Sequence, residues 1–237
     1  MKPRLSFACI AHKSEAHHVM RMVTTLPGDA ELIVLWNEQG DNQDVVERKI
    51  VELKNGLTVK YYETQWHELD FATLRNISIG LCSAEWIMWI DADDRLLIHQ
   101  HEFFDELANY PQGVGGLVCG CVGSQPKHDE KGEILRYHTP QVRIFRNGRG
   151  FFFEGSTHEQ VSWSIERDAF RIDSCSLLVH HVGYEITADA MTKKLQRNVK
   201  GLARAIVGGS DQAQLEYWTR VLLRDSSSLN YYFDKEK

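Results

Sequence analysis

The sequence predicts an α/β protein with a central, mostly parallel mixed sheet flanked by helices. From residue 5 to residue 96, short apolar stretches alternate with stretches of helical periodicity, the pattern of right-handed βαβ crossovers and a parallel sheet. Beyond residue 110 two strand-like stretches follow one another without a helix between them, which predicts an antiparallel extension. The 237 residues are enough to enclose one sizeable core.

In the first half of the chain, strands and helices are expected to alternate strictly. Turn residues mark two of its boundaries, at Pro27-Gly28-Asp29 and at Asn55-Gly56. Strands are predicted at residues 5–10, 31–36, 57–62 and 85–91, and helices at 14–26, 44–54 and 70–82.

In the second half the strands become neighbours in sequence. A helix is expected at 101–109, then strands at 114–122 and 134–145 joined by a polar loop over 123–133, and a last strand at 176–181. Glycines surround an aromatic run at 151–153. Two further helices are predicted at 187–207 and 211–223, and the polar tail beyond residue 226 is expected to fray.

Composition excludes several classes of protein. The net charge of −6, with Lys and Arg dispersed, disfavours a nonspecific nucleic-acid binder. There is no secretory leader pattern, and no stretch approaches the roughly 18 apolar residues of a membrane span, so we expect a cytoplasmic protein. The five cysteines are scattered and read as reduced core thiols rather than disulfides or zinc ligands.

The stretch EWIMWIDADDRL, residues 85–96, carries the clearest chemical signal. A buried strand there ends in Asp91, Asp93 and Asp94, and parallel sheets bind ligands beyond the carboxyl ends of their strands. Such acids repel one another unless a cation lies between them, and Mg²⁺ or Mn²⁺ prefers carboxylate oxygens. The alternative is local: strand-end Asp is a common turn residue, and Asp94 could cap a helix beginning near Leu96.

Other residues could converge on these acids. His158-Glu159 follows the glycine and aromatic loop, where a carboxylate can act as a general base, although Glu154 is an alternative. Either His180 or His181 should face inward at the end of the last strand. Arginine forks suited to a diphosphate are Arg75, beside Asn76, and Arg143, Arg146 and Arg149; Arg75 is the one we select.

Two other enzyme classes remain open at this point. A metal-dependent phosphohydrolase can use Asp-x-Asp at a strand end, but usually on the first strand. A nucleotidyltransferase would need a glycine-rich phosphate loop after the first strand, and the segment AHKSEAHH, residues 11–18, has no glycine. A noncatalytic module that binds a sugar or nucleotide is a third possibility.

The chain resembles family 2 glycosyltransferases of the GT-A fold. The likeness spans residues 5–184 and rests on LRNISIGLCSAEWIMWIDADD, RIFRNGRGFFFEGSTHEQV and the HVGY element near its end. It implies an inverting transferase of the hexosyl or pentosyl class, with a nucleoside-diphosphate sugar donor, a UDP-sugar first, and Mn²⁺ or Mg²⁺ as cofactor. It also implies a catalytic domain over 1–184, a helical extension over 185–225 and a polar tail over 226–237.

The resemblance assigns roles by position. Asp91 would lie near the ribose and metal, Asp93 and His181 would ligate the metal, and Glu159 would be the catalytic base. The nucleotide site would include Ala11, Glu15, Asn37 and Arg75. Many relatives have Asp-Asp-x-Ser where this chain has WNEQGDN, so Asn37 replaces the base-reading Asp, and Asp41 is a possible substitute.

The resemblance leaves the acceptor open. A glycan, a lipid-linked precursor, a protein or a modified nucleic acid would each fit the chemistry. The predicted helices over 187–223 carry basic residues at spacings that could form one face for a membrane or a phosphate-bearing acceptor, so peripheral membrane contact is possible; a solvated helix face is the alternative.

Overall fold

The computed structural model describes residues 3–38, 44–65, 71–97, 100–128, 134–155 and 158–182, together with Gln196 and Val199. Apart from these two residues, the predicted helical extension lies outside the described residues, as do the polar tail and Asp41. Within the described part of the chain, no helix has both the length and the apolar character needed to cross a membrane.

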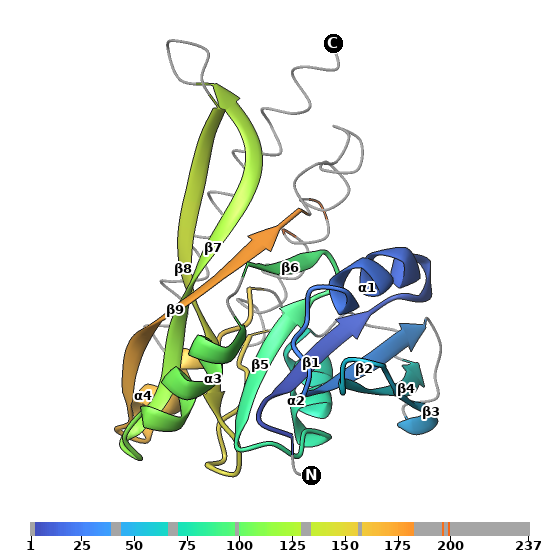
Figure 1. Cartoon of the computed structure of the whole chain (residues 1–237), viewed down its shortest axis with the longest axis horizontal. Helices are drawn as coiled ribbons and strands as arrows, with labels where there is room; N and C mark the ends of the chain where they lie inside the picture. The colour runs from blue at the N-terminus through green and yellow to red at the C-terminus, as the bar shows by residue number, and fades with distance from the viewer. Residues whose placement is uncertain are drawn as a thin grey trace.

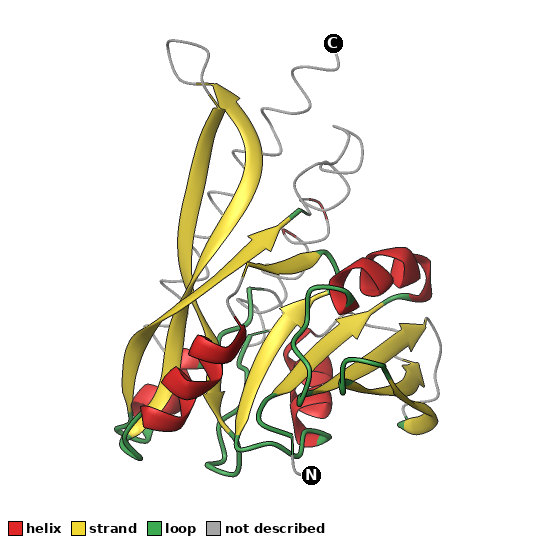
Figure 2. Ribbon diagram, in the orientation of Figure 1, coloured by secondary structure: helices red, strands yellow, loops and turns green. Residues whose placement is uncertain are grey.

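One mixed sheet organises the molecule (Figures 1 and 2). Its nine strands lie in the order β3-β4-β2-β1-β5-β8-β7-β9-β6. The strands β4, β2, β1 and β5 are parallel, as predicted, while β8 and β7 form the expected antiparallel extension. Their bounds are β1 Ser6–Ala11, β2 Glu31–Glu38, β3 Val46–Glu52, β4 Thr58–Gln65, β5 Trp86–Asp91, β6 Asp94–Leu97, β7 Val114–His128, β8 Ile134–Arg146 and β9 Arg171–His181.

Helices cover both faces of the sheet. On one face α1 (Ala16–Val23), preceded by the 3-10 turn η1 (Lys13–Glu15), and α3 (Gln100–Asn109) pack on a core that includes Phe7 and Leu32. On the other face α2 (Phe71–Gly80) and α4 (Ser162–Arg167) pack with the loop after β8 on a second core that includes Ile87 and Phe145. Figure 1 shows α3 in front of the sheet and α2 behind it.

The predicted helix over 44–54 is wrong. Residues Val46–Glu52 form β3, an antiparallel edge strand on β4. The apolar pattern fits a helix, but the outer edge of β4 has backbone groups that need partners, and β3 supplies them. Cross-strand contacts reinforce the pairing, with Arg48 bonded to Glu63 and Tyr62 donating to Glu47.

The alternative in which Asp94 caps a helix does not hold, because this residue begins strand β6. The chain turns at Ala92 and Asp93 directly after β5, yet β6 pairs with β9 and not with β5. Figure 1 shows β6 and β9 lying together above the tip of β5. The antiparallel register sets Asp94 opposite His181, so this strand pairing brings the acid run and the histidine together.

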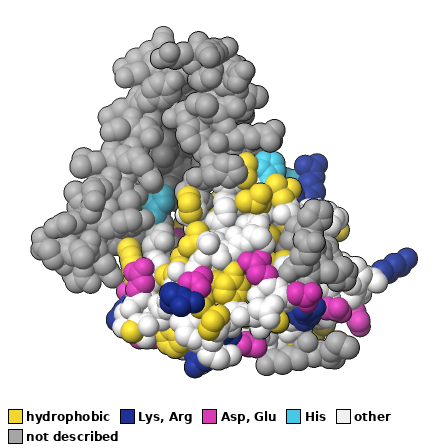
Figure 3. Space-filling view, turned by 60° about the vertical axis from the view of Figure 1, so that its left-hand side comes forward, with side chains coloured by type: hydrophobic (Ala, Val, Ile, Leu, Met, Phe, Trp, Pro, Cys, Tyr) yellow, Lys and Arg dark blue, Asp and Glu magenta, His cyan; other side chains and the backbone are white. Residues whose placement is uncertain are grey.

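The charged side chains and the cysteines are arranged as the composition led us to expect. On the face in Figure 3, acidic and basic side chains of the described residues are interspersed. All five cysteines are free thiols, and Cys9, Cys119 and Cys121 are buried.

Candidate functional site

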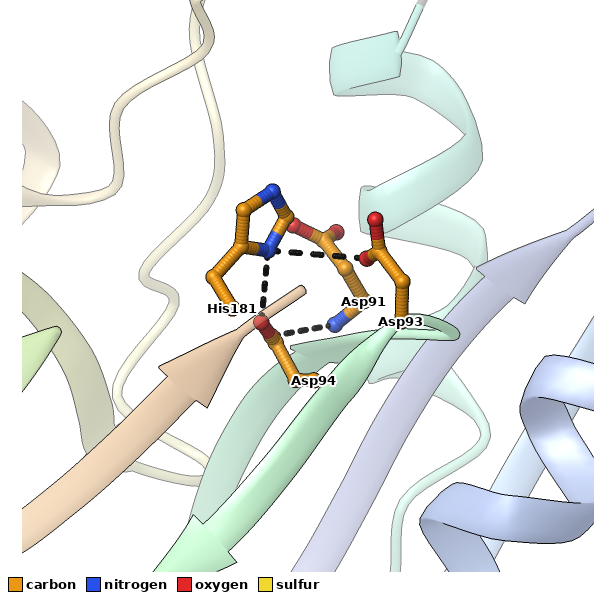
Figure 4. Close-up of side chains that lie close together, drawn as sticks. All are labelled: Asp91, Asp93, Asp94 and His181. Carbon is orange, nitrogen blue, oxygen red and sulfur yellow. Dashed lines mark hydrogen bonds and ion pairs between the residues drawn. The ribbon is translucent and has the colours of Figure 1, made fainter. Parts of the chain in front are cut away.

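Four side chains converge beyond the end of β5. Asp91 ends that strand, Asp93 lies in the turn, Asp94 begins β6 and His181 ends β9 (Figure 4). Each offers a ligand atom, and these atoms all lie within 4.8 Å of one another. His180 pairs with Arg95 in the register, and it is the neighbouring His181 whose ring reaches the carboxylates. Of the two histidines left open by the sequence, the structure brings His181 into the group.

Asp94 is the enclosed member of the group. Its side chain is 0% exposed, and one carboxylate oxygen accepts from Arg143 Nη1 at 2.8 Å and from the backbone N–H of Asp91 at 2.8 Å. The other oxygen lies 2.7 Å from Nδ1 of His181, so this nitrogen carries the proton. Burial opposes a charged imidazole, but the bond to Asp94 outweighs it and raises the pKa of His181. Asp94 therefore orients the ring.

The donor set fits a hard divalent cation. Because Nδ1 is held by Asp94, the nitrogen left for a metal is Nε2. In Figure 4, Nε2 points to the same side as the Asp93 oxygen that lies farther from Nδ1. A carboxylate that holds the second ring nitrogen is a common support for a metal-binding histidine. Asp91 and Asp93 are partly accessible, with side chains 30% and 24% exposed, whereas Asp94 is enclosed.

Arg75 of α2 links this group to a second carboxylate. Its Nη2 donates to Asp91 Oδ1 at 2.7 Å and its Nε donates to Glu159 Oε1 at 2.6 Å. Burial disfavours the ionised form of Asp91, but Arg75 and Arg143 outweigh it and hold the pKa of that carboxyl well below its usual range. Burial likewise opposes the charge on Arg75, yet the two carboxylates outweigh burial and raise the pKa of its guanidinium above the usual value. Asp91 and Arg75 are thus both charged at neutral pH.

The loop after β8 presents Glu159 and turns Glu154 away. Glu159 has an 11% exposed side chain and faces Arg75. Glu154 instead forms an ion pair with Arg167 of α4. The structure therefore places Glu159, of these two candidates, at the strand-end site. His158 adopts a positive φ of 56°, within the turn that brings Glu159 to this position.

Trp89 forms the floor beneath both arginines. The Cζ atom of Arg143 lies 3.7 Å, and that of Arg75 4.2 Å, from the centroid of its ring. An aromatic face attracts guanidinium groups, so Trp89 helps to hold two like charges near one another. Its Nε1 donates to the carbonyl of Val142 at 2.7 Å, which fixes the ring to β8.

The remaining predicted residues lie at the ends of β1 and β2 and in η1. Ala11 ends β1 and Asn37 lies near the end of β2, at the same sheet edge as Asp91. The carboxylate of Glu15 accepts from the backbone N–H of His12 at 2.8 Å and so caps η1. The roles of these three residues at a nucleotide stay predictions.

Two of the other predicted arginines lie elsewhere. Arg146 bonds to the carbonyls of Val114 and Tyr110 and pairs with Glu85 at the opposite end of β5. Arg149 donates to Gln112 at 2.8 Å on the surface.

The sequence drew attention to Asp94, Arg143 and Asn76 without their contacts, and it gave no sign of Trp89. The Asp-x-Asp-Asp motif drew attention to Asp94, yet its buried partner comes from β8, about fifty residues away. Asn76 was seen only as the neighbour of Arg75, and its contacts lie on a loop far along the chain. Such pairs carry no local signal.

The chain is similar to known glycosyltransferases. It is 24% identical over 188 residues to glycosyltransferase SunS of Bacillus phage SPbeta and to the SPbeta prophage-derived glycosyltransferase SunS of Bacillus subtilis (strain 168). The match covers 78% of this chain and 41% of each relative, so the chain spans about two fifths of their length. No family profile matches the chain.

Among solved structures, mannosyltransferase PcManGT from Pyrobaculum calidifontis, in complex with GDP-Man and Mn²⁺, has a similar fold. The TM-score is 0.51 at 13% sequence identity, and the match covers 99% of this chain and 74% of that one. The fold is therefore GT-A-like. The described residues of this chain contain one group suited to a metal ion, at the strand ends of that fold.

Proposed function

We propose that the protein is a metal-dependent, inverting glycosyltransferase of family 2. It would transfer a hexosyl or pentosyl group from a nucleoside-diphosphate sugar to an acceptor hydroxyl. The observation that carries the proposal is the Arg75 bridge, which joins Asp91 of the acid cluster to Glu159 on the loop. A donor-binding edge and a candidate base are thereby held together in one site.

Mn²⁺ or Mg²⁺ would be held by Asp93 and His181, with Asp91 near the nucleotide. Such a cation would offset negative charge on the diphosphate leaving group. Arg75 has a further nitrogen, Nη1, that is buried and has no hydrogen-bond partner among the described residues. Buried donors are nearly always paired, so a substrate oxygen at this point would satisfy it. This supports placing the donor against Arg75.

Glu159 would accept the proton of the acceptor hydroxyl. Its carboxylate lies 2.6 Å from Arg75 Nε, which holds it beside the acid cluster, and a base must lie within hydrogen-bond reach of the proton it accepts. Attack from the face opposite the leaving group would invert the anomeric centre. Ala11, Glu15 and Asn37 would border the nucleobase.

The comparisons support the donor class and leave the nucleotide to experiment. PcManGT is described with GDP-Man and Mn²⁺. UDP is our first choice and GDP the first alternative. The acceptor, a glycan, lipid-linked precursor, protein or modified nucleic acid, would be sought after the donor is known.

The test combines a thermal-shift panel with two variants. UDP, GDP, CDP, ADP and dTDP are each measured with and without Mn²⁺, and a ligand at a hundred times its Kd stabilises by about 2.7 kcal/mol. We expect one nucleotide to raise the Tm only with metal, and Asp93→Ala to abolish that rise. Glu159→Gln should keep the rise but lower kcat of sugar transfer by about 10²- to 10⁴-fold.

Three results would count against the proposal. If no nucleotide gives a metal-dependent rise in Tm, the proposed donor site is refuted. Loss of nucleotide binding in Glu159→Gln would refute the role of Glu159 as base. Retention of configuration in the product would refute the inverting mechanism.

A further inference from the structure

Asn76, next to Arg75 on α2, grips the backbone of the loop that carries Glu159. Its Nδ2 donates to the carbonyl of Phe153 at 3.0 Å, and its Oδ1 accepts from the N–H of Phe153 at 2.7 Å. One side-chain amide thus pairs with both backbone groups of one residue, as a neighbouring strand would. Asn is a modest helix former, so its place inside α2 is explained by this contact and not by helix propensity.

The loop transmits that grip to Glu159. Directly after Phe153, the backbone of Glu154 exchanges two hydrogen bonds with Gln160, each of 3.0 Å. Glu159 is therefore the neighbour of the bridge residue Gln160, and the clamped Phe153 is the neighbour of the other bridge residue, Glu154. The Phe153 ring is 2% exposed and packs edge-on against Trp89 and Phe145, which removes further freedom.

Successive residues of α2 thus act on the two parts of one unit. Arg75 holds the carboxylate of Glu159 and ties it to Asp91, whereas Asn76 holds the backbone of the same loop. Because both come from one turn of α2, this helix contacts the loop through its backbone and through the Glu159 carboxylate.

We propose that Asn76 is a positioning residue that sets the catalytic geometry of Glu159 by clamping Phe153. This inference rests on the proposed transferase function and deepens it. Asn76 touches no predicted substrate group, so its loss should lower kcat and leave donor binding intact. A misplacement of about 1 Å can cost about 10²-fold in rate, and we expect a kcat loss of that order in Asn76→Ala.

The clamp itself is tested without any substrate. Hydrogen exchange of a peptide spanning 151–161 is compared in the wild-type chain, Asn76→Ala and Asn76→Asp. We expect the fastest exchange in Asn76→Ala and an intermediate rate in Asn76→Asp, which keeps the acceptor for Phe153 N–H but loses the donor. Asn109→Ala, the same change at an exposed position of α3, is the control and should match wild type. Unchanged exchange in Asn76→Ala would overturn the clamp.

The catalytic meaning is tested by a double-mutant cycle with Glu159→Gln. If Asn76 acts through Glu159, adding Asn76→Ala to Glu159→Gln should lower kcat by less than about threefold further, since coupled residues are not additive. A general structural defect would cost the same factor in both backgrounds, and that additive result would overturn the positioning role. The metal-dependent Tm rise with nucleotide should persist in Asn76→Ala, and its loss would also count against the inference.

Failure of the proposed function would look different. A wild-type chain that transfers no sugar from any donor, yet shows the expected exchange pattern, would keep the clamp and refute its catalytic role.

Discussion

At the residue scale, the carboxylates of the acid motif differ through their partners. Asp94 is enclosed and bound by Arg143 and His181, whereas the Asp93 side chain is 24% exposed. Removing one member of a buried ion pair leaves an uncompensated charge, which is costly. The same Asp-to-Ala change should therefore damage the fold at one position and metal binding at the other.

We predict that Asp94→Ala lowers the free energy of unfolding by about 3–5 kcal/mol, because Arg143 would stay buried without its closest carboxylate. The midpoint of urea denaturation measures this. Asp93→Ala is the matched control, and its free energy of unfolding should stay within about 1 kcal/mol of wild type, as for partly exposed charges. Equal losses in both variants would show that burial does not separate the two residues.

At the element scale, a buried acid joins neighbouring strands at the end of the sheet opposite the site. Glu31 begins β2, and its side chain is 2% exposed. It accepts from Ser6 Oγ on β1, from Lys60 Nζ on β4 and from Ser83 before β5. Burial opposes its ionisation, but these bonds outweigh burial and lower the pKa of Glu31. Neighbouring parallel strands are thereby tied together through one carboxylate.

This predicts a specific pH dependence. The pKa of Glu31 is lower in the folded chain than its unfolded value of about 4.3, so the unfolded state binds the proton more readily. The stabilisation is complete above about pH 4.3 and is lost as the pH falls through the lower folded pKa. Glu31→Gln should cost about 1–3 kcal/mol at pH 7 and lose less further stability on acidification than wild type. Denaturation midpoints measured from about pH 6 to pH 3 check this. Parallel pH curves for the two proteins would contradict it.

A further consequence at this scale concerns β6 and β9. The chain leaves β5 at Asp91 and, through the turn, enters a strand at the far edge of the sheet order. Because β9 lies beside β6, a histidine about ninety residues later reaches the acids. The candidate metal group is thus a property of strand pairing, and any change that shifts the β6–β9 register would separate His181 from Asp94.

At the scale of the whole molecule, the site is held together by protein cations. Asp91, Asp94 and Glu159 each have an arginine partner within 2.8 Å. The fold therefore has internal compensation for these acids and does not depend on a metal for it.

We expect EDTA to change the Tm of the ligand-free chain by less than about 2 °C, because a ligand stabilises only in proportion to its occupancy. The rise in Tm produced by nucleotide should disappear on chelation and return on adding Mn²⁺. A large fall in Tm on chelation alone would show that a metal is part of the folded structure.

The sequence by itself determined the fold class and the chemical character of the site. Alternating apolar and helical stretches predict the parallel half, because periodicity reports which face of an element is buried. The Asp-x-Asp-Asp run after an apolar strand predicts acids at a sheet edge, since strand direction decides where such a run emerges. The same local signals identified Arg75, Glu159 and the pair of histidines as residues to examine.

Only the tertiary structure decided which of these residues meet. Residues 44–54 fit a helical pattern, yet the open edge of β4 makes them a strand, because backbone pairing at a sheet edge outweighs a weak local preference. The choice of His181 over His180 and of Glu159 over Glu154, and the pairing of Asp94 with Arg143, depend on contacts between residues far apart in the chain. Spacing along the sequence carries no record of such distances; the packing of strands and helices sets them.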